Sequence, residues 1–306
     1  MNSTTTSADV ASLTAAARPS ADFSALVERA LAQALQADGA AALVAGPVSA
    51  LAGAAGAKRA RPWLVSVFGS AAEVWATESL VDAAVGVELI HTASLLHDDV
   101  VDEATERRGQ PAANVRFGNT RAVLAGDWAL TCALEQLGRR LAFLRPAIEV
   151  VARMTRAIAV EVEGRRRLLP LDDWEAMARG KTGSLFGLCG RLAGLCARDE
   201  DRAEAFARCG EELGLAFQLA DDIADLSGVG GKGRFNDLRT GSPSYPVLWA
   251  AARDARLGAD LLATWQLSTS TSIRTELEAL GSRVIAQGAV QAADEAARRP
   301  GGPARR

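Results

Sequence analysis

The chain has 306 residues, of which 49% are hydrophobic and 23% charged, and its formal net charge is −3. This composition is that of an ordinary globular protein and excludes a chain that is disordered throughout. The small negative net charge gives no electrostatic reason to bind nucleic acid, so no nucleic-acid partner is expected. The four cysteines form no C-x-x-C pair and stand in apolar surroundings, which favours buried free thiols in a reducing cytoplasm.

Two stretches of the first 60 residues, 1–20 and 39–57, lack the pattern of a targeting or membrane segment. Residues 1–20 have no basic start and no continuous apolar stretch, so they are predicted to form a disordered tail rather than a signal peptide. Residues 39–57 carry no charge, but Pro47 and many Ala and Gly make them too weakly apolar for a membrane span. We therefore expect a cytoplasmic protein with no transmembrane segment, a disordered tail at 300–306 and a single domain over 21–299.

Apolar residues recur at intervals of three and four along most of the chain, and alternating β-branched runs are scarce. The pattern predicts an all-α protein whose elements are separated by Gly, Pro and Asp/Asn clusters. The predicted helices are, in chain order, 22–36, 40–54, 60–75, 78–104, 119–141, 145–168, 172–179, 182–197, 201–227, 243–255 and 273–298.

The predicted helix 78–104 is apolar on nearly every face, which is typical of a helix at the centre of a bundle. Its C-terminal end nevertheless gathers Asp98, Asp99 and Asp102, where the helix dipole disfavours negative charge. Such a violation of the local rules is expected at a functional site.

The same D-D-x-x-D spacing returns at Asp221, Asp222 and Asp225, again at the end of an apolar helix. Positions i and i+4 share a helix face, so each triplet presents a small acidic platform. One such triplet is as often a solvated helix end as a site, but two copies favour a functional role. Mg²⁺ binds through a few carboxylates plus substrate phosphates, so two facing platforms are expected to hold Mg²⁺ ions around a diphosphate.

Basic residues accompany both triplets. Lys58, Arg59 and Arg61 form one cluster, Arg107 and Arg108 follow the first triplet, and Lys181 lies before the second. Each cluster alone is more often surface charge, but arginine binds phosphate oxygens bidentately, and the combination fits a diphosphate. His91 lies about two helical turns before Asp98 and is expected to face the same site.

These residues resemble the trans-isoprenyl (polyprenyl) diphosphate synthases, and most closely the medium- and long-chain ones. "LLHDDVVDEATERRGQPAANVRFGN" is similar to the family's first aspartate-rich motif, and "FQLADDIADLSG" is similar to the second. The segments "KRARP", "ELIHTAS", "LAGDWAL" and "GKTGSLF" match further landmarks of the family in the same order.

The resemblance implies a helical bundle around a deep central cavity, usually in a homodimer. It implies that an allylic diphosphate ionises with the help of Mg²⁺ and then alkylates isopentenyl diphosphate. Three Mg²⁺ ions are expected, and Mn²⁺ is expected to be able to replace them. The implied metal ligands are Asp98, Asp99, Asp102, Asp221, Asp222 and Asp225. The implied allylic diphosphate ligands are Arg107, Lys181, Thr182 and Lys232, the isopentenyl diphosphate ligands are Lys58, Arg61, His91 and Arg108, and Gln218 is placed beside the reacting carbons.

Three departures from the family pattern stand out. Ser242 in "TGS" occupies a position where the family has a diphosphate-contacting lysine, and Arg165 follows Gly164 where the family has Gln or Glu. Arg165 is expected to pair with Glu161 or Glu163, or to reach the cavity wall. The sequence also stops short of the last helical turns that often cover the site in the family.

Two other classes of function remain open on the sequence. A terpene cyclase on the same scaffold needs one diphosphate site, so it has no use for Lys58, Arg61 and His91, and it commonly lacks the second D-D-x-x-D triplet. A non-catalytic regulatory subunit tends to lose one acidic motif, whereas this chain has both. Both comparisons favour the synthase.

The resemblance also predicts product length. The growing tail is expected to run along the helix away from Asp98, and the first residues that it meets are Ser94 and Ala93. Bulky aromatic residues close the cavity at these positions in short-chain relatives. Because both residues are small here, a product longer than C20 is expected.

Overall fold

The computed structural model describes residues 21–36, 39–53, 59–107, 109–228, 234–267 and 271–298. Lys58, Arg108, Lys232 and the predicted tails at 1–20 and 300–306 lie outside these residues. Within the described ranges the regular secondary structure is helical apart from one short hairpin, which confirms the all-α class. The elements are α2 (Ala21–Ala34), η1 (Gly39–Ala41), α3 (Ala42–Ala52), α4 (Ala60–Ala71), α5 (Glu78–Val101), β1 (Glu106–Arg107), β2 (Gln110–Pro111), α6 (Ala113–Phe117), α7 (Asn119–Gly138), α8 (Leu141–Glu163), α9 (Leu171–Ala178), η2 (Arg179–Gly183), α10 (Ser184–Cys196), α11 (Glu200–Ser227), α12 (Asn236–Thr240), α13 (Tyr245–Arg253), α14 (Ala255–Gln266), α15 (Thr271–Ala286) and α16 (Ala289–Ala297).

Several predicted boundaries differ from the observed ones for local reasons. The predicted helix 273–298 is two helices, because Gly288 adopts a φ of +83° and begins a new helix at Ala289. Helix α14 was not predicted; it begins where the side chain of Asp254 accepts a hydrogen bond from the backbone N of Leu257. The short helices α6 and α12 and the hairpin were also missed. The prediction that all cysteines are buried is wrong for Cys209, which is exposed.

The chain forms two compact units. The first contains the residues up to Glu149 together with Leu188–Ala207, and the second contains Val150–Gly187 and the residues from Arg208 onward. Helices α8, α10 and α11 therefore each contribute residues to both units. The prediction that residues 21–299 form one structural domain stays a prediction.

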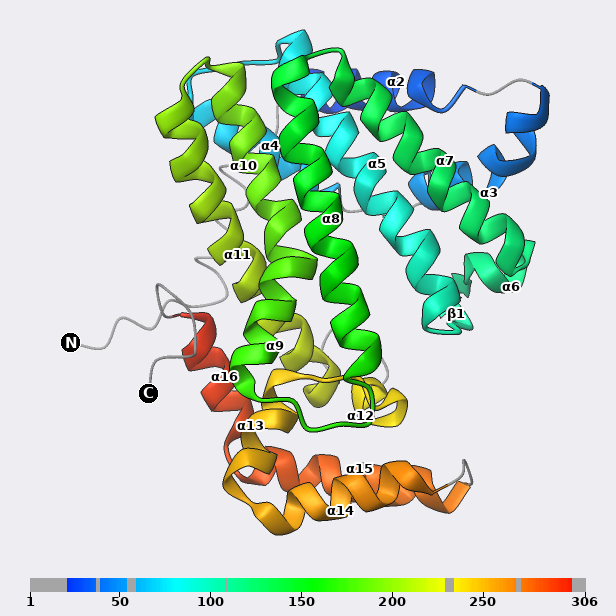
Figure 1. Ribbon diagram of the computed structural model, residues 1–306, viewed down its shortest axis with the longest axis vertical. Coiled ribbons are helices and arrows are strands. Elements are labelled where there is room, and N and C mark those ends of the chain that lie inside the picture. The colour runs from blue at the N-terminus through cyan, green and yellow to red at the C-terminus, as the bar shows by residue number, and fades with distance from the viewer. Residues whose placement is uncertain are drawn as a thin grey trace. The chain divides into compact units, whose positions relative to one another are not determined.

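Helix α5 is the core of the first unit. It begins at Thr77, whose side chain accepts a hydrogen bond from the backbone N of Leu80, and it packs on α7, α4, α2 and α3. Helices α5 and α7 run side by side in Figure 1. Leu89, Ile90 and Leu96 are almost fully buried, and each such side chain contributes roughly 1.5–3 kcal/mol through burial. The prediction of a central, buried helix is confirmed.

Two carboxylates are also buried within α5. Asp82 accepts a hydrogen bond of 2.6 Å from the amide of Gln136 on α7, and Glu88 accepts one of 2.9 Å from Arg59. Burial raises the pKa of Asp82, and the charges of Arg139 and Arg140 oppose that rise. These partners allow α5 to carry charge inside the core, since a buried carboxylate needs a hydrogen-bonding partner.

By length and composition, α5 is also the one described helix that would be able to cross a membrane. In the structure 78% of its most apolar window is buried against the rest of the protein. This burial is what is expected of the core helix of a soluble bundle.

The second unit is built on its C-terminal helices. Helix α13 packs against α9, α14, α15 and α16, and Figure 1 shows α14 and α15 lying side by side. The buried side chains form two clusters, one centred on Leu257, Leu261 and Val284 and the other on Trp174 and Leu219. This core holds the end of α11, which carries the second acidic triplet, against the start of α13.

Candidate active site

The first acidic triplet lies where α5 ends. Asp99 is fully buried, and its two carboxylate oxygens have different partners. One accepts a hydrogen bond from Nε of Arg107 on β1, and the other accepts a bond of 2.8 Å from the backbone N of Ala113, the first residue of α6. Asp99 therefore fixes the hairpin and α6 to the end of α5, and it holds Arg107, a predicted diphosphate ligand, beside the triplet.

The other two carboxylates of the first triplet are closer to solvent. Asp98 is half-buried and Asp102 is exposed, and the spacing of four residues places them on one face of the helix end. Asp102 is the C-terminal capping residue of α5. In position, Asp98 and Asp102 are therefore better suited than Asp99 to bind an external ligand.

Two predicted isopentenyl diphosphate ligands lie in contact in the first unit. Nη1 of Arg61 on α4 lies 3.0 Å from Nε2 of His91 on α5. Because a guanidinium group can only donate, Nε2 of His91 is the acceptor. In this contact Nε2 of His91 therefore carries no proton, and the ring proton is on Nδ1.

The neighbouring Arg59 has a structural role. It binds both oxygens of Glu28, at 2.6 and 3.0 Å, and it also donates to Glu88 of α5. These contacts join α2 to α5 through the start of α4, where Arg59 adopts a left-handed φ of 47°. Of the described basic residues at 58–61, Arg61 is thus the one in contact with another predicted ligand, His91.

His97 directly precedes the first triplet and packs on α7. A Cβ on Gly126 would lie 2.3 Å from Nε2 of His97, so only glycine allows this approach. The same ring nitrogen lies 3.2 Å from a carboxylate oxygen of Asp127. The glycine and aspartate of the "LAGDWAL" segment therefore position α7 against the end of α5.

The residues predicted to control product length differ in their surroundings. Ala93 is almost fully buried among small side chains of the first unit, including Val48 on α3 and Ala122, Ala125 and Ala129 on α7. Ser94 is half-buried, and its hydroxyl donates to the backbone O of His91. A large residue at position 93 would therefore overpack the core, whereas one at position 94 has more room.

The second unit presents Lys181 and Thr182 on η2, a π-helical segment between α9 and α10. Segments of this kind occur frequently at functional sites. Lys181 forms an ion pair with Glu161 of α8, so Glu161 already has a cation beside it. Thr182 donates to Oε1 of Gln218 at 2.8 Å, and Nε2 of Gln218 donates to Asp222 at 2.9 Å. A chain of hydrogen bonds thus links η2 to the second triplet.

The second triplet fixes the beginnings of two further helices. The second carboxylate oxygen of Asp222 accepts a bond of 2.8 Å from the backbone N of Tyr245, the first residue of α13. Asp225 accepts bonds from the backbone N of Asn236 and Asp237, the first residues of α12. Both carboxylates are buried, while Asp221 is half-buried.

Asp237 belongs to this acidic cluster, although the sequence analysis missed it. Burial raises its pKa well above the ordinary value, and so do the charges of Asp222, Asp225 and Asp221. Burial likewise raises the pKa of Asp222 to about 7, with further contributions from Asp221 and Glu161. Asp237 stands outside any D-D-x-x-D pattern, so spacing gave no signal for it. Its position in a polar turn between two apolar helices was the only available hint.

The donor set suits a hard divalent cation that is shared with a substrate. Among the described residues no three His, Cys, Asp or Glu side chains converge to form a complete metal site. The carboxylates of the second unit nevertheless raise one another's pKa, which shows an excess of negative charge. Mg²⁺ commonly binds through one or two carboxylates plus substrate phosphates, and an incomplete acidic cluster fits that mode.

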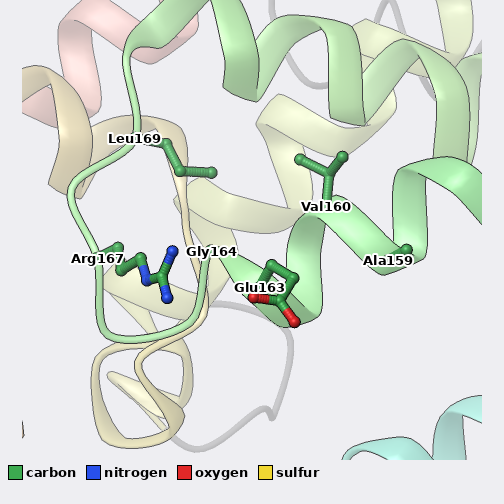
Figure 2. A pocket seen from close by; sticks show the side chains of 6 residues that line it. All are labelled: Ala159, Val160, Glu163, Gly164, Arg167 and Leu169. Atoms are coloured by element: carbon green, nitrogen blue, oxygen red, sulfur yellow. The ribbon is translucent and has the colours of Figure 1, made fainter.

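A separate hollow of about 300 Å³ lies at the end of α8 in the second unit. Figure 2 shows Ala159, Val160 and Glu163 on the helix, and Arg167 and Leu169 on the loop that follows Gly164. None of these residues was predicted to belong to the site. The side chain of Arg167 lies at this hollow (Figure 2).

Comparison with known proteins agrees with this geometry. Residues 43–275 match the family model described as polyprenyl synthetase. The chain is 34% identical over 280 residues to the nonaprenyl diphosphate synthase of Mycobacterium tuberculosis, which covers 82% of this chain and 80% of that protein. It is 33% identical over 254 residues to the farnesyl diphosphate synthase of Escherichia coli, covering 75% of this chain and 85% of that protein.

The fold matches solved structures as well. A decaprenyl diphosphate synthase from Rhodobacter capsulatus superimposes with a TM-score of 0.82 at 28% sequence identity, covering 90% of this chain and 86% of that one. The chain belongs to the polyprenyl synthetase family of prenyltransferases. These relatives are named for products of different length. Their names therefore do not determine the length of this protein's product.

Proposed function

We propose that the chain condenses isopentenyl diphosphate with an allylic diphosphate to make an all-trans polyprenyl diphosphate longer than C20. The observation that carries this proposal is the acidic cluster at the end of α11, where burial raises the pKa of Asp222 to about 7. Carboxylates crowded in this way are stabilised when a divalent cation and an anionic substrate bind together. The first triplet, with Arg107 beside it, offers a similar set of groups.

In this reaction the bond between the allylic carbon and the diphosphate oxygen breaks, and the electron pair leaves with the diphosphate. The double bond of isopentenyl diphosphate then forms the new carbon–carbon bond, and a proton is lost. Lys181 and Arg107 would bind the departing diphosphate. Thr182 and Gln218, which hydrogen-bond each other, would direct their dipoles toward the developing positive charge.

Bound Mg²⁺, or Mn²⁺ in its place, would neutralise the diphosphate and help it to leave. Asp98, Asp102 and Asp221 are the carboxylates with the most exposure to a ligand, as half-buried or exposed residues. In Asp99, Asp222 and Asp225 both carboxylate oxygens already accept hydrogen bonds. These three residues would therefore orient the neighbouring carboxylates.

Arg61 and His91 would bind the diphosphate of isopentenyl diphosphate, together with Lys58 and Arg108. The contact between Arg61 and His91 supports this role, because it holds two of these side chains next to each other. We also place the enzyme in the cytoplasm, since the one long apolar helix among the described residues is mostly buried in the core.

The face of α8 supports the proposal of a homodimer. Its exposed or half-buried residues Leu141, Leu144, Ile148, Val151, Thr155, Ile158 and Val162 are spaced alternately by three and four. Leu141 is 83% exposed and Ile148 is 51% exposed. Large apolar side chains that are exposed along one helix face often mark an interaction surface. A seam with this spacing packs well against the same seam of a second copy. Replacing Ile148 with Glu should then convert a dimer into monomers in analytical ultracentrifugation.

One incubation tests the function. Purified protein with Mg²⁺, farnesyl diphosphate and isopentenyl diphosphate should yield prenyl diphosphates longer than C20, separable by chromatography. A cyclic hydrocarbon product would indicate a terpene cyclase, and no turnover without a second protein would indicate a regulatory subunit. Product length is tested by Ser94→Phe, which should shorten the product to C15–C20 while leaving the melting temperature nearly unchanged. The same change at Ala93 should also lower stability, by about 1–3 kcal/mol, because that site is tightly packed.

A further inference from the structure

Three arginines, Arg165, Arg166 and Arg167, follow the end of α8 in a loop of the second unit. Arg166 adopts a left-handed φ of 59°, and its backbone N donates a bond of 2.7 Å to the backbone O of Gly241. A Cβ on Gly241 would lie 2.5 Å from Cγ of Arg166. The side chain of Arg166 therefore runs directly over Gly241.

The segment that Arg166 covers is held by the second acidic triplet at both ends. Helix α12, which precedes the segment, begins at backbone N–H groups that are bound to Asp225. Helix α13, which follows it, begins at Tyr245, whose N–H is bound to Asp222. Gly241–Ser244 is therefore a short segment between two helices that the triplet positions. Ser242 carries no charge, and its backbone N donates to the backbone O of Asp237.

Carboxylates flank this segment on both sides. Asp225 lies against the start of α12, Asp237 lies on α12, and Asp222 lies against the start of α13. Arg166 is exposed, and no ion pair joins it to a carboxylate in the part of the chain that the structure describes. A cation that lies over this segment and forms no ion pair with a described carboxylate is available to an anionic ligand.

We propose that Arg166 is a further diphosphate-binding residue, which grips the substrate's diphosphate at the segment Gly241–Ser244. This inference rests on the proposed function, because it assigns a new ligand to the same site. The guanidinium group is suited to this role, since it binds two phosphate oxygens at once and never loses its charge. The backbone bond to Gly241 keeps the residue in place whatever side chain it carries.

The chain offers a clean substitution at this position. Arg166→Gly removes the cation, while glycine adopts the observed positive φ without strain, so the loop should keep its conformation. Arg166→Lys keeps the charge but loses the bidentate geometry. The matched control is Arg167→Ala, because the side chain of Arg167 lies at the hollow beside Glu163, as Figure 2 shows.

The test is calorimetric titration of inorganic diphosphate into the protein in the presence of Mg²⁺. We expect Arg166→Gly to weaken binding by about tenfold or more, as is usual for a charge-assisted hydrogen bond. Arg166→Lys should bind with intermediate affinity, and Arg167→Ala should bind like the wild type. Adding Ser242→Lys to Arg166→Gly should restore affinity, because it returns a cation to the same segment. Melting temperatures of all variants should lie close together.

The outcomes separate this proposal from the function on which it rests. Wild-type affinity in Arg166→Gly, or failure of the wild type to bind diphosphate, would overturn the role of Arg166. If Arg166→Gly instead tightened Mg²⁺ binding without weakening diphosphate binding, Arg166 would serve only to neutralise carboxylates, and the proposal would be wrong. Binding that depends on Arg166 in a protein without prenyl transfer would support the residue's role and contradict the proposed function.

Discussion

The two acidic triplets have the same spacing but a different charge balance. Asp99 and Asp222 occupy the same position in their triplets, both are buried, and each binds the first backbone N–H of a following helix. The remaining oxygen of Asp99 meets the guanidinium of Arg107, whereas that of Asp222 meets the neutral amide of Gln218. Burial raises the pKa of Asp222 to about 7.

The same motif therefore fixes the start of a helix in both places, while the charge of its other hydrogen-bond partner differs. In the first triplet, the buried carboxylate of Asp99 pairs with Arg107. In the second, the buried carboxylate of Asp222 accepts bonds from neutral donors, and burial raises its pKa and that of Asp237. The following changes test that difference, in order of decreasing expected effect.

The largest effect is expected from removing one exposed carboxylate of each triplet. Asp98→Ala and Asp221→Ala should each lower turnover by about 100-fold or more, because stabilisation of charge at a leaving group is often the largest catalytic contribution. Steady-state assays with saturating Mg²⁺ measure this loss. Asp294→Ala, an exposed residue paired with Arg298 on α16, is the control. Near-normal turnover in either triplet variant would show that only one triplet takes part.

The buried aspartates should differ in their contribution to stability. Asp99→Asn removes the partner of Arg107 and should lower the free energy of unfolding by roughly 1.5–3 kcal/mol, as is typical for a hydrogen bond to a charged group. Asp222→Asn at pH 8 removes a charge that burial disfavours, so its stability should stay near that of the wild type. Urea unfolding at pH 8 gives both values. Equal losses would contradict the proposed difference in charge balance.

Basic residues near the two triplets should act on different substrates. His91→Ala and Arg61→Ala should raise the KM for isopentenyl diphosphate by about tenfold, the effect of one charge-assisted hydrogen bond. Lys181→Ala should instead raise the KM for the allylic substrate. Initial rates with each substrate varied in turn distinguish the two effects. Equal changes in both constants for every variant would argue against two separate diphosphate sites.

The smallest effect concerns pH in the metal-free protein. An unfolded aspartate releases its proton near pH 4, whereas folded Asp222 keeps it up to about pH 7. Between these values the folded state binds more protons, so raising the pH through this window should lower stability. Melting temperatures in EDTA should fall by several degrees from pH 5 to pH 8, and Asp222→Asn should flatten that slope. A slope unchanged in this variant would mean that another group is responsible.

Much of the site was predictable because its signals are local. The apolar residues of α5 predicted a buried helix, and the spacing of the aspartates placed two acidic platforms at helix ends. The contact between Arg61 and His91 agrees with their predicted common role. Each of these inferences uses residues a few helical turns apart, where periodicity alone determines which side chains share a face.

The tertiary structure alone decided which charges meet. Asp225 binds the start of α12, Asp237 joins the triplet, and Arg166 lies over Gly241 across some 75 residues of sequence. No local pattern encodes such pairs, because they depend on how loops return to the ends of distant helices. The sequence by itself determined the all-α class and the two acidic motifs, since both follow from helical periodicity. Folding decided how deeply each of these carboxylates is buried and which backbone N–H groups it binds, since both depend on segments that return from elsewhere in the chain.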